Sequence, residues 1–464
     1  MDNLAVLILA AGLGKRVGSG RAKVLLKASG LTLLEHVAKA CAPLLPTKIV
    51  VITGFGREEV EAVLKDTPDL PSSVKSQISF AFQKEQLGTG DAVRSAKDEL
   101  AHFQGTVLVL YGDVPLVTPN TLQTFLDFHT RSNHTLSILS FHMPVTNSYG
   151  RIIRDLNTGE IKKISEAKDL GEGANQFEEC NSGIYAVDSA FLFSAVARLK
   201  NENSQSEFYL TDIVEMACAE GQRVDALKFE DASEFLGVNT MSELVRVKGE
   251  LYSRKLSELT AHGVEIEDAA SVYIDSSVTV EKGAFIGPNV QLRGKTKIAS
   301  GVKIEGTAVL IDTTVEEGAT IKLGVRAEAA VIGKHASVGP FANLRPGTNL
   351  GDSVKIGNFV ETKNTHMHSG AKASHLSYLG DAEVGKEANI GAGTITCNYD
   401  GVNKNKTKIG EGAFIGSNSS LVAPVAIGSG AYVGAGSVIT KNVPDKALAL
   451  TRAGLTVKEN WKRR

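Results

Sequence analysis

Cysteine is scarce in this sequence, and its four cysteines, Cys41, Cys180, Cys218 and Cys397, lie far apart. No CxxC pair occurs, so neither a disulfide framework nor a zinc ribbon is indicated, and a reduced cytosol fits best. Long hydrophobic runs are also missing. The apolar stretch 4–11 lacks a basic leader and is too short to cross a bilayer, so we expect a buried strand there. These absences favour a cytoplasmic protein without a membrane partner.

The sequence has no excess of basic charge, because 52 Asp and Glu balance 50 Lys and Arg. A strongly basic surface supplies most of the affinity in sequence-independent nucleic-acid binding, so we expect no nucleic-acid partner. Any anionic ligand would have to be met by local cations. With 464 residues, 42% of them hydrophobic and 22% charged, the chain is long enough for two or three domains.

The C-terminal half places an apolar residue at every sixth position, often followed by a small residue. The runs are Val280, Ile286, Leu292, Ile298, Ile304 and Leu310; Ile332, Val338, Leu344, Leu350 and Ile356; and Ile409, Ile415, Leu421, Ile427 and Val433. This period is typical of a parallel β-helix, whose stacked coils bury one aliphatic ladder. We expect breaks in the repeat at 359–381 and 394–408, and functional residues to gather there.

The first half, to about residue 237, alternates apolar and amphipathic segments. We expect strands at Ala5–Leu9, Lys48–Thr53 and Thr106–Tyr111, and helices at Thr32–Ala42, Arg57–Lys65 and Pro119–Arg131. This alternation predicts a mostly parallel sheet with helices on both faces and a ligand beyond the carboxyl ends of its strands. Between the two halves, residues 242–262 predict one charged helix that ends at Gly263.

The end of the first expected strand carries the strongest chemical signal. Residues 9–16, Leu-Ala-Ala-Gly-Leu-Gly-Lys-Arg, are followed by Arg21 and Lys23. Small residues let backbone N–H groups approach phosphate oxygens, and clustered cations neutralise them. The Gly-Lys-Ser/Thr ending of a P-loop and the GxGxxG spacing of a dinucleotide site are both missing. From this local pattern alone, a solvated Gly-rich loop stays an alternative.

Two further segments favour a nucleotide site. Residues 111–116, Tyr-Gly-Asp-Val-Pro-Leu, place Asp113 at the carboxyl edge of the sheet, where a metal-bound triphosphate could sit. Residues 83–90, Gln-Lys-Glu-Gln-Leu-Gly-Thr-Gly, add amide side chains and a second Gly turn. Together these motifs resemble the sugar-nucleotide pyrophosphorylases. With the hexapeptide half included, nearly the whole chain resembles the bacterial bifunctional N-acetylglucosamine-1-phosphate uridylyltransferase/glucosamine-1-phosphate acetyltransferase family.

The resemblance implies a site for UTP and the sugar in the first half. The residues that it implies there are Leu9, Ala10, Ala11, Gly12, Lys23, Gln83, Gly88, Thr89, Tyr111 and Gly112 for UTP, Gly150, Glu166 and Asn181 for the sugar, and Asp113 and Asn239 for Mg²⁺. The implied reaction is in-line attack of the sugar 1-phosphate on the α-phosphorus of UTP, catalysed mainly by positioning and charge neutralisation. Taken singly, Asp113 could cap a turn and Asn239 could order a loop; the shared order of the motifs favours binding.

The sequence departs from the family's usual pattern at three places. Ala22 stands where a Pro commonly precedes the phosphate-binding lysine, and Ser148 replaces a Gly before a Tyr-Gly pair. Residues 165–168, Ser-Glu-Ala-Lys, differ around the sugar-binding Glu166. None of these changes removes a charged contact, so they bear on affinity and on the fit of the sugar loop rather than on the reaction class.

Two segments of the second half match the acetyltransferase motifs of the same family: residues 375–381, His-Leu-Ser-Tyr-Leu-Gly-Asp, and residues 389–401, Asn-Ile-Gly-Ala-Gly-Thr-Ile-Thr-Cys-Asn-Tyr-Asp-Gly. Acetyl transfer needs a neutral amine and therefore a general base, a role that suits histidine. His375 is the candidate base, and we expect Glu361 to orient it. The other residues implied are Arg345, Lys363, Tyr378 and Asn389 for glucosamine 1-phosphate, and Ala392, Asn398, Tyr399, Ser417, Ala435 and Arg452 for acetyl-CoA. Without the motifs, these cations would be taken for surface residues and the small residues for turns of the coil.

The resemblance also implies a left-handed coil and a homotrimer with acetyltransferase sites between subunits. We expect a nucleotidyltransferase domain at 1–238, a linker helix at 239–263, a left-handed β-helix at 264–445 and a tail at 446–464. The implied enzyme uses acetyl-CoA to acetylate glucosamine 1-phosphate, then joins N-acetylglucosamine 1-phosphate to UTP, giving UDP-N-acetylglucosamine for cell-envelope synthesis.

Two other functions are compatible with this plan. One is a monofunctional pyrophosphorylase whose solenoid only assembles the oligomer, and the motifs at His375 and 389–401 argue against it. The other is a non-catalytic regulatory subunit, and the intact Lys23, Asp113 and Asn239 argue against that.

Overall fold

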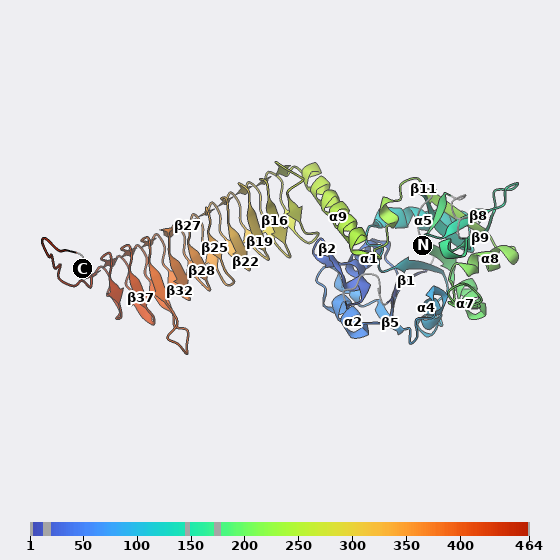
Figure 1. Ribbon diagram of the computed structural model, residues 1–464, viewed down its shortest axis with the longest axis horizontal. Helices are drawn as coiled ribbons and strands as arrows, with labels where there is room; N and C mark the ends of the chain where they lie inside the picture. Colours follow the sequence, from blue (N-terminus) through green and yellow to red (C-terminus); the bar gives the residue numbers. More distant parts are fainter. Residues whose placement is uncertain (1–2, 13–19, 144–148, 171–177, 463–464) are drawn as a thin grey trace. The chain divides into compact units, whose positions relative to one another are not determined.

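The chain forms two compact units, 1–251 and 252–464 (Figure 1). The structure is a computed structural model that describes residues 3–12, 20–143, 149–170 and 178–462. The division falls within α9 (Met241–Ala261), which is the charged helix that the sequence predicts. Gly263 follows it with a φ of 86°, and the Val264 N–H donates to the Leu259 carbonyl at 3.1 Å. Helix α9 therefore ends in the left-handed glycine turn that its sequence indicates.

The first unit is built on one twisted sheet. Its strands are β1 (Leu4–Ala10), β4 (Lys48–Thr53), β5 (Ile78–Phe82), β6 (Thr106–Tyr111), β7 (Leu136–His142), β8 (Arg151–Arg154), β9 (Ile161–Ser165), β10 (Glu179–Asp188) and β11 (Val224–Phe229). The strand order is β11-β7-β10-β6-β1-β4-β5, and β8 and β9 extend from β10. β1 is parallel to β4 and β6, whereas β10 is antiparallel to β6 and β7. The expected mostly parallel sheet is confirmed.

Helices cover both faces of this sheet. They are α1 (Leu33–Cys41), α2 (Arg57–Asp66), α3 (Ser72–Lys75), α4 (Thr89–Ser95), α5 (Pro119–Arg131), α6 (Ala167–Leu170), α7 (Ser189–Arg198) and α8 (Asp212–Ala219). One hydrophobic core lies between the sheet and α1, α2 and α5, and a second between the other face and α4, α7 and α8. Alternate residues of β1 enter the two cores, as the pleat of a strand requires: Val6 and Ile8 on one face, Leu7 and Leu9 on the other. None of the described helices is long and apolar enough to cross a membrane.

The second unit is a left-handed parallel β-helix with three sheets, one along each side of the coil. They run from β12 (Glu265–Ile266) to β41 (Leu448–Ala449), from β13 (Tyr273–Ile274) to β40 (Val438–Ile439), and from β14 (Thr279–Val280) to β38 (Val425–Ile427). The aliphatic residues of the six-residue period point inward and form one core along the coil, in which Ile286, Leu292 and Ile298 are buried. The period therefore predicts the core correctly.

The break expected at 359–381 is wrong. Strands β28 (Glu361–Lys363), β29 (His366–Met367), β30 (Lys372–His375) and β31 (Tyr378–Gly380) continue all three sheets through this segment. These strands are hard to recognise in the sequence for two reasons. Thr362 and Ala373 fill inward positions without being large aliphatic residues, and the step from Thr362 to Met367 is one residue shorter than the period. The second expected break is real, since residues 398–406 form an insertion between β34 (Ile395–Cys397) and β35 (Thr407–Ile409).

Candidate functional site

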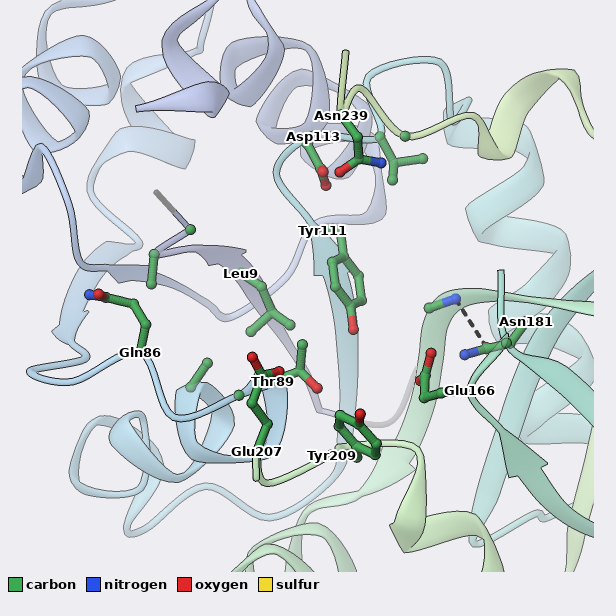
Figure 2. A pocket seen from close by; sticks show the side chains of 18 of the residues that line it. Leu9, Gln86, Thr89, Tyr111, Asp113, Glu166, Asn181, Glu207, Tyr209 and Asn239 are labelled. Atoms are coloured by element: carbon green, nitrogen blue, oxygen red, sulfur yellow. Dashed lines mark hydrogen bonds between the residues drawn. The ribbon is translucent and has the colours of Figure 1, made fainter. Parts of the chain in front are cut away.

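A pocket of about 760 Å³ opens where β1, β5 and β6 end (Figure 2). This volume lies in the range of small-molecule sites. All of the expected UTP, sugar and metal residues line the pocket except Gly112, whose backbone packs beneath it, where a Cβ would lie 3.2 Å from the Leu9 carbonyl oxygen. Residues 13–16 of the Gly-rich segment and Ser148 lie outside the described residues.

At one end of the pocket, two oxygen-bearing side chains converge on a lysine ammonium. Lys23, in the short helix η1 (Lys23–Leu25), forms an ion pair with Asp113 and donates a hydrogen bond to Asn239 Oδ1 at 2.9 Å. Figure 2 shows the Asp113 and Asn239 side chains next to each other. Among the described residues, no group of three or more His, Cys, Asp or Glu is suited to a metal. A cation held here would therefore take its further ligands from water or from substrates.

The backbone explains why Asn239 lies beside Asp113. The Val238 N–H donates to the Asp113 carbonyl at 2.9 Å, which joins the segment before α9 to the loop after β6. The Glu243 carboxylate accepts from the N–H groups of Asn239 and Thr240, both at 2.7 Å. Glu243 N–H in turn donates to the Thr240 hydroxyl at 3.2 Å, completing a capping box. The start of α9 thus fixes the backbone that carries Asn239.

The Gly-rich segment after β5 is packed against a distant part of the chain. Gly88 has a φ of 115°, and a Cβ on it would lie 2.6 Å from the Phe208 carbonyl oxygen, so only glycine fits. Thr89 accepts from the Leu210 N–H at 3.0 Å. The Gln83 amide donates to the Gly88 carbonyl at 3.1 Å, which fixes its orientation at the pocket wall. This part of the wall is therefore formed in advance of ligand binding.

At the other end of the pocket, hydrogen bonds hold the polar side chains of Asn181 and Glu166 in place. The Asn181 N–H donates to the Gly150 carbonyl at 2.9 Å, and its side-chain amide donates to the Tyr185 hydroxyl at 2.7 Å. Glu166 accepts from the Thr211 hydroxyl at 3.2 Å, and burial raises the pKa of its carboxyl group. Amide and carboxyl groups held in this way can recognise sugar hydroxyls through paired donors and acceptors.

Further residues line the pocket that were given no binding role from the sequence. Gln86, Glu207 and Tyr209 face the pocket (Figure 2). Lys168 and Gln205 also line it and are joined by a hydrogen bond of 2.7 Å. Gln86 belongs to the segment 83–90, so its place in that motif could have indicated a binding role. Nothing in the sequence links Lys168 to Gln205.

The pH dependence of stability offers one test of this region. Burial, with smaller contributions from Glu215 and Asp169, raises the pKa of Asp212 to about 6. The charged carboxylate therefore costs stability above pH 6, and that cost fades as pH falls from 6 to 4, because the folded chain then binds a proton that the unfolded chain lacks. We expect Asp212→Asn to raise the unfolding free energy at pH 7.5 by about 1–2 kcal/mol, after allowance for solvent screening, and by almost nothing at pH 4. Urea unfolding followed by far-UV circular dichroism at both pH values measures this; an equal gain at both would contradict it.

In the β-helix, His375 is the last residue of β30, before a sharp corner of the coil. Ala392, Ser417 and Ala435 take the same place in the following coils. The residues after these four all have positive φ: Leu376 (49°), Gly393 (74°), Asn418 (55°) and Gly436 (73°). The Asn418 N–H donates to the Ala392 carbonyl and the Gly436 N–H to the Ser417 carbonyl, both at 2.7 Å. The structure thus aligns His375 with three of the expected acetyl-CoA residues in one column.

A cluster of cations lies on the neighbouring face. The Lys404 ammonium, with a smaller contribution from Arg345, lowers the pKa of Lys363. Arg345 also forms an ion pair with Glu361 at 2.9 Å. Like charges at this spacing repel one another, so an anionic group such as a phosphate would be favoured among them. Lys404 was not among the residues expected from the sequence, and it lies in the insertion 398–406.

The expected contact between His375 and Glu361 is wrong. His375 Nδ1 lies 2.6 Å from the Asn358 side-chain oxygen. Glu361 lies beyond the corner at Phe359, where its two oxygens accept from Arg345 at 2.9 Å and from Asn343 at 3.1 Å. Within the described residues, the Glu361 carboxylate thus pairs with side chains of its own face, and the His375 ring is bonded to Asn358 instead.

Within the described residues, none of the remaining expected residues forms a hydrogen bond with the His375 side chain. Tyr378 lies in β31 and Asn389 in β33 (Asn389–Ile390), on the two faces that meet at the corner. Asn398 donates to Asp381, and the Tyr399 hydroxyl donates to the Gly401 carbonyl within the insertion, at 2.6 Å. Arg452, in the exposed tail, lies near Gly434.

Comparison with known proteins agrees with both folds. Residues 5–247 match the nucleotidyl transferase family, residues 406–441 match the bacterial transferase hexapeptide family, and residues 269–338 match the GMPPB C-terminal domain. Relatives called bifunctional protein GlmU are similar over the full chain. Those of Geotalea daltonii and Acinetobacter baumannii are each 43% identical, over 100% and 99% of this chain and 99% and 98% of the relative; that of Streptococcus equi subsp. zooepidemicus is 41% identical, over 100% of this chain and 98% of the relative.

The fold and the pocket define a nucleotidyltransferase joined to a hexapeptide-repeat transferase. The chain belongs to the GlmU family of bifunctional proteins. It is an enzyme of UDP-N-acetylglucosamine biosynthesis, with uridylyltransferase and acetyltransferase activities on small-molecule substrates.

Proposed function

We propose that the pocket of the first unit binds UTP, N-acetylglucosamine 1-phosphate and Mg²⁺, and that the column at His375 is the acetyltransferase site. We assign residues 1–238 to the uridylyltransferase domain, 239–263 to the linker helix, 264–445 to the acetyltransferase domain and 446–464 to the tail. The observation that carries the first assignment is the convergence of Asp113 and Asn239 on the Lys23 ammonium. One carboxylate and one amide oxygen suit Mg²⁺, which commonly takes few protein ligands and completes its shell with water and phosphate.

The chain's own residues account for uridylyl transfer mainly by positioning. Leu9–Gly12 and Lys23 hold the UTP phosphates, while Gln83, Gly88 and Thr89 hold the uracil and ribose. Gly150, Glu166 and Asn181 hold the sugar with its 1-phosphate in line with the α-phosphorus, and pyrophosphate leaves from the opposite side. When bound, Mg²⁺ neutralises charge on the phosphates. The pocket wall at Gly88 supports this assignment. Its packing against Phe208 and the hydrogen bond at Thr89 hold it in place, and a fixed site orients its substrates at little entropic cost.

Acetyl transfer follows from an exposed imidazole beside a cluster of cations. Arg345 and Lys363, together with Lys404, bind the phosphate of glucosamine 1-phosphate. His375 accepts a proton from the amine as the N–C bond to the acetyl carbon forms and the C–S bond of acetyl-CoA breaks. Tyr378, Asn389, Asn398 and Tyr399 fix the sugar and the thioester. Ala392, Ser417, Ala435 and Arg452 line the path of acetyl-CoA, and the small residues that follow His375 along its column support that path.

The exposed apolar residues near His375 support a homotrimer. Phe341, Phe359 and Leu376 form a ladder along one corner of the coil and are 49%, 58% and 62% exposed, and the two phenylalanine rings stack 5.8 Å apart. Apolar ladders of this kind mark protein interfaces. Three copies around a common axis would bury all three ladders and enclose His375 between chains. Light scattering tests this, with an expected mass of about three times the chain's 49.2 kDa.

The substrates support a cytoplasmic enzyme, because UTP and acetyl-CoA are made inside the cell. The four cysteines are free of disulfides in the structure, which agrees with a reducing compartment.

One assay tests both halves of the proposal. Purified protein is incubated with glucosamine 1-phosphate, acetyl-CoA, UTP and Mg²⁺, and the products are measured by mass spectrometry. UDP-N-acetylglucosamine together with free CoA is the expected result. Formation of the nucleotide sugar only from pre-acetylated sugar phosphate would contradict the acetyltransferase role and leave the β-helix a scaffold.

A further inference from the structure

We propose that Asn358 is a positioning residue for acetyl transfer, which selects the tautomer of His375 and fixes the orientation of its ring. This inference rests on the proposed role of His375 as the base. Its starting point is the contact of 2.6 Å between His375 Nδ1 and Asn358 Oδ1.

The backbone holds the two side chains side by side. β27 (Lys355–Asn358) and β30 are adjacent parallel strands, in which Asn358 pairs directly with His375. The Leu376 N–H donates to the Asn358 carbonyl at 3.0 Å, and the Ser377 hydroxyl donates to the His375 carbonyl at 2.9 Å. Both residues immediately precede a left-handed corner residue, Phe359 in one coil and Leu376 in the next. The pairing is therefore built into consecutive coils rather than into a mobile loop.

The chemistry of the amide decides which ring nitrogen carries the proton. An amide oxygen only accepts, so the Nδ1 atom of His375 must donate its hydrogen to Asn358 Oδ1. In the neutral ring, the lone pair then lies on Nε2. Nε2 is the atom that takes the proton of the attacking amine. A ring with the opposite tautomer would present a hydrogen to the amine and could not act as its base.

The partner of the His375 ring is a neutral amide rather than a carboxylate. Within the described residues, Asn358 is the side chain that bonds to the His375 ring, while Glu361 is held by Arg345 and Asn343. A carboxylate in place of the amide would stabilise the imidazolium and favour the protonated ring. The amide orients the ring without adding that charge.

The test compares variants of the full chain. We expect Asn358→Ala to lower kcat for acetyl transfer by about 10–100-fold, as loss of an orienting partner typically does, with KM for glucosamine 1-phosphate within about twofold. Asn358→Asp keeps the size and an acceptor, so it should retain more activity than Asn358→Ala. Its acidic limb in the pH profile of kcat/KM should move up by about one pH unit, because the carboxylate favours the imidazolium. A merely structural role would not shift that limb.

Asn349→Ala is the matched control, because Asn349 lies in register with His366 on another sheet, as Asn358 does with His375. Neither activity should change in this variant. Uridylyl transfer should also stay unchanged in both Asn358 variants, and their thermal unfolding, followed by circular dichroism, should match that of the wild type, which shows that the β-helix folds as well as the first unit. An Asn358→Ala enzyme with kcat within twofold of the wild type, or an Asn358→Asp enzyme with an unshifted limb, would overturn the inference. Full acetyl transfer by His375→Ala would instead overturn the proposed base, and with it the premise.

Discussion

Replacement of Asp113 by alanine is expected to abolish uridylyl transfer and to leave acetyl transfer unchanged. Without the carboxylate, this end of the pocket loses the charged one of the two oxygen ligands proposed for a divalent cation, and the charge that opposes Lys23 is lost. If metal binding contributes about 4 kcal/mol at the transition state, uridylyl transfer should fall by about 10³-fold. Pyrophosphate release from UTP and N-acetylglucosamine 1-phosphate measures the first activity, and CoA release from acetyl-CoA and glucosamine 1-phosphate measures the second.

Two further variants and a chelation experiment separate a lost metal site from a lost fold. Asp113→Asn keeps the shape of the side chain, so it should unfold at nearly the wild-type temperature while losing most uridylyl transfer. Asp127→Ala removes a half-exposed carboxylate that pairs with Arg131 on α5, and it should change neither activity. Removal of divalent cations with EDTA should reproduce the pattern of Asp113→Ala. Equal loss of both activities in the alanine variant would indicate misfolding, and full uridylyl transfer would exclude Asp113 as the metal ligand.

The fold is readable from the sequence wherever every repeat faces the same surroundings. In the β-helix each inward residue meets the core, so Ile286 and Leu292 repeat with the period of the coil. The same reasoning fails at Thr362 and Ala373, where smaller inward residues serve and one step is short. In the first unit, the runs that became β1, β4 and β6 are buried except at their ends, and β1 lies between two parallel neighbours, which makes these runs continuous and easy to recognise.

The place of the pocket proposed for the nucleotide could be predicted, because the carboxyl ends of parallel strands meet at one edge of the sheet. Leu9 and Tyr111 are partners across β1 and β6, so the residues that follow them must lie close together. The position of Asn239 could not be predicted in this way, because it depends on the hydrogen bond from the Val238 N–H to the Asp113 carbonyl. The bond between Lys168 and Gln205 depends on tertiary packing that has no local signature.

The environment of His375 was harder to predict because it depends on the length of one coil. Its partner lies one coil earlier, at Asn358, and the short step near Met367 sets that spacing. Glu361 instead forms an ion pair with Arg345, which lies on the same face of the coil. Lys404 lies in an insertion, where the period gives no position at all. The six-residue period thus predicts residue positions in regular coils, whereas positions in insertions and shortened coils have to come from the structure.

The second large effect is expected for His375→Ala, which should lower acetyl transfer by about 10²–10⁴-fold and leave uridylyl transfer intact. The side chain is exposed, so its removal leaves no buried cavity. The residual acetylation should increase as pH rises, because the amino sugar then loses its proton to solvent and attacks without a base. His368→Ala is the matched control, since His368 is a half-exposed histidine of the same solenoid, 3.5 Å from Glu383, and its loss should change neither rate.

The rate of CoA release across a pH series distinguishes this mechanism from simple binding. Loss of a base lowers kcat and makes the remaining rate follow the ionisation of the amine, whereas loss of a binding contact raises KM and leaves the shape of the pH profile unchanged. Acetyl transfer within a few fold of the wild type in His375→Ala would exclude the imidazole as the base. The proton would then have to leave by another route, and the orienting contact with Asn358 would have no catalytic meaning.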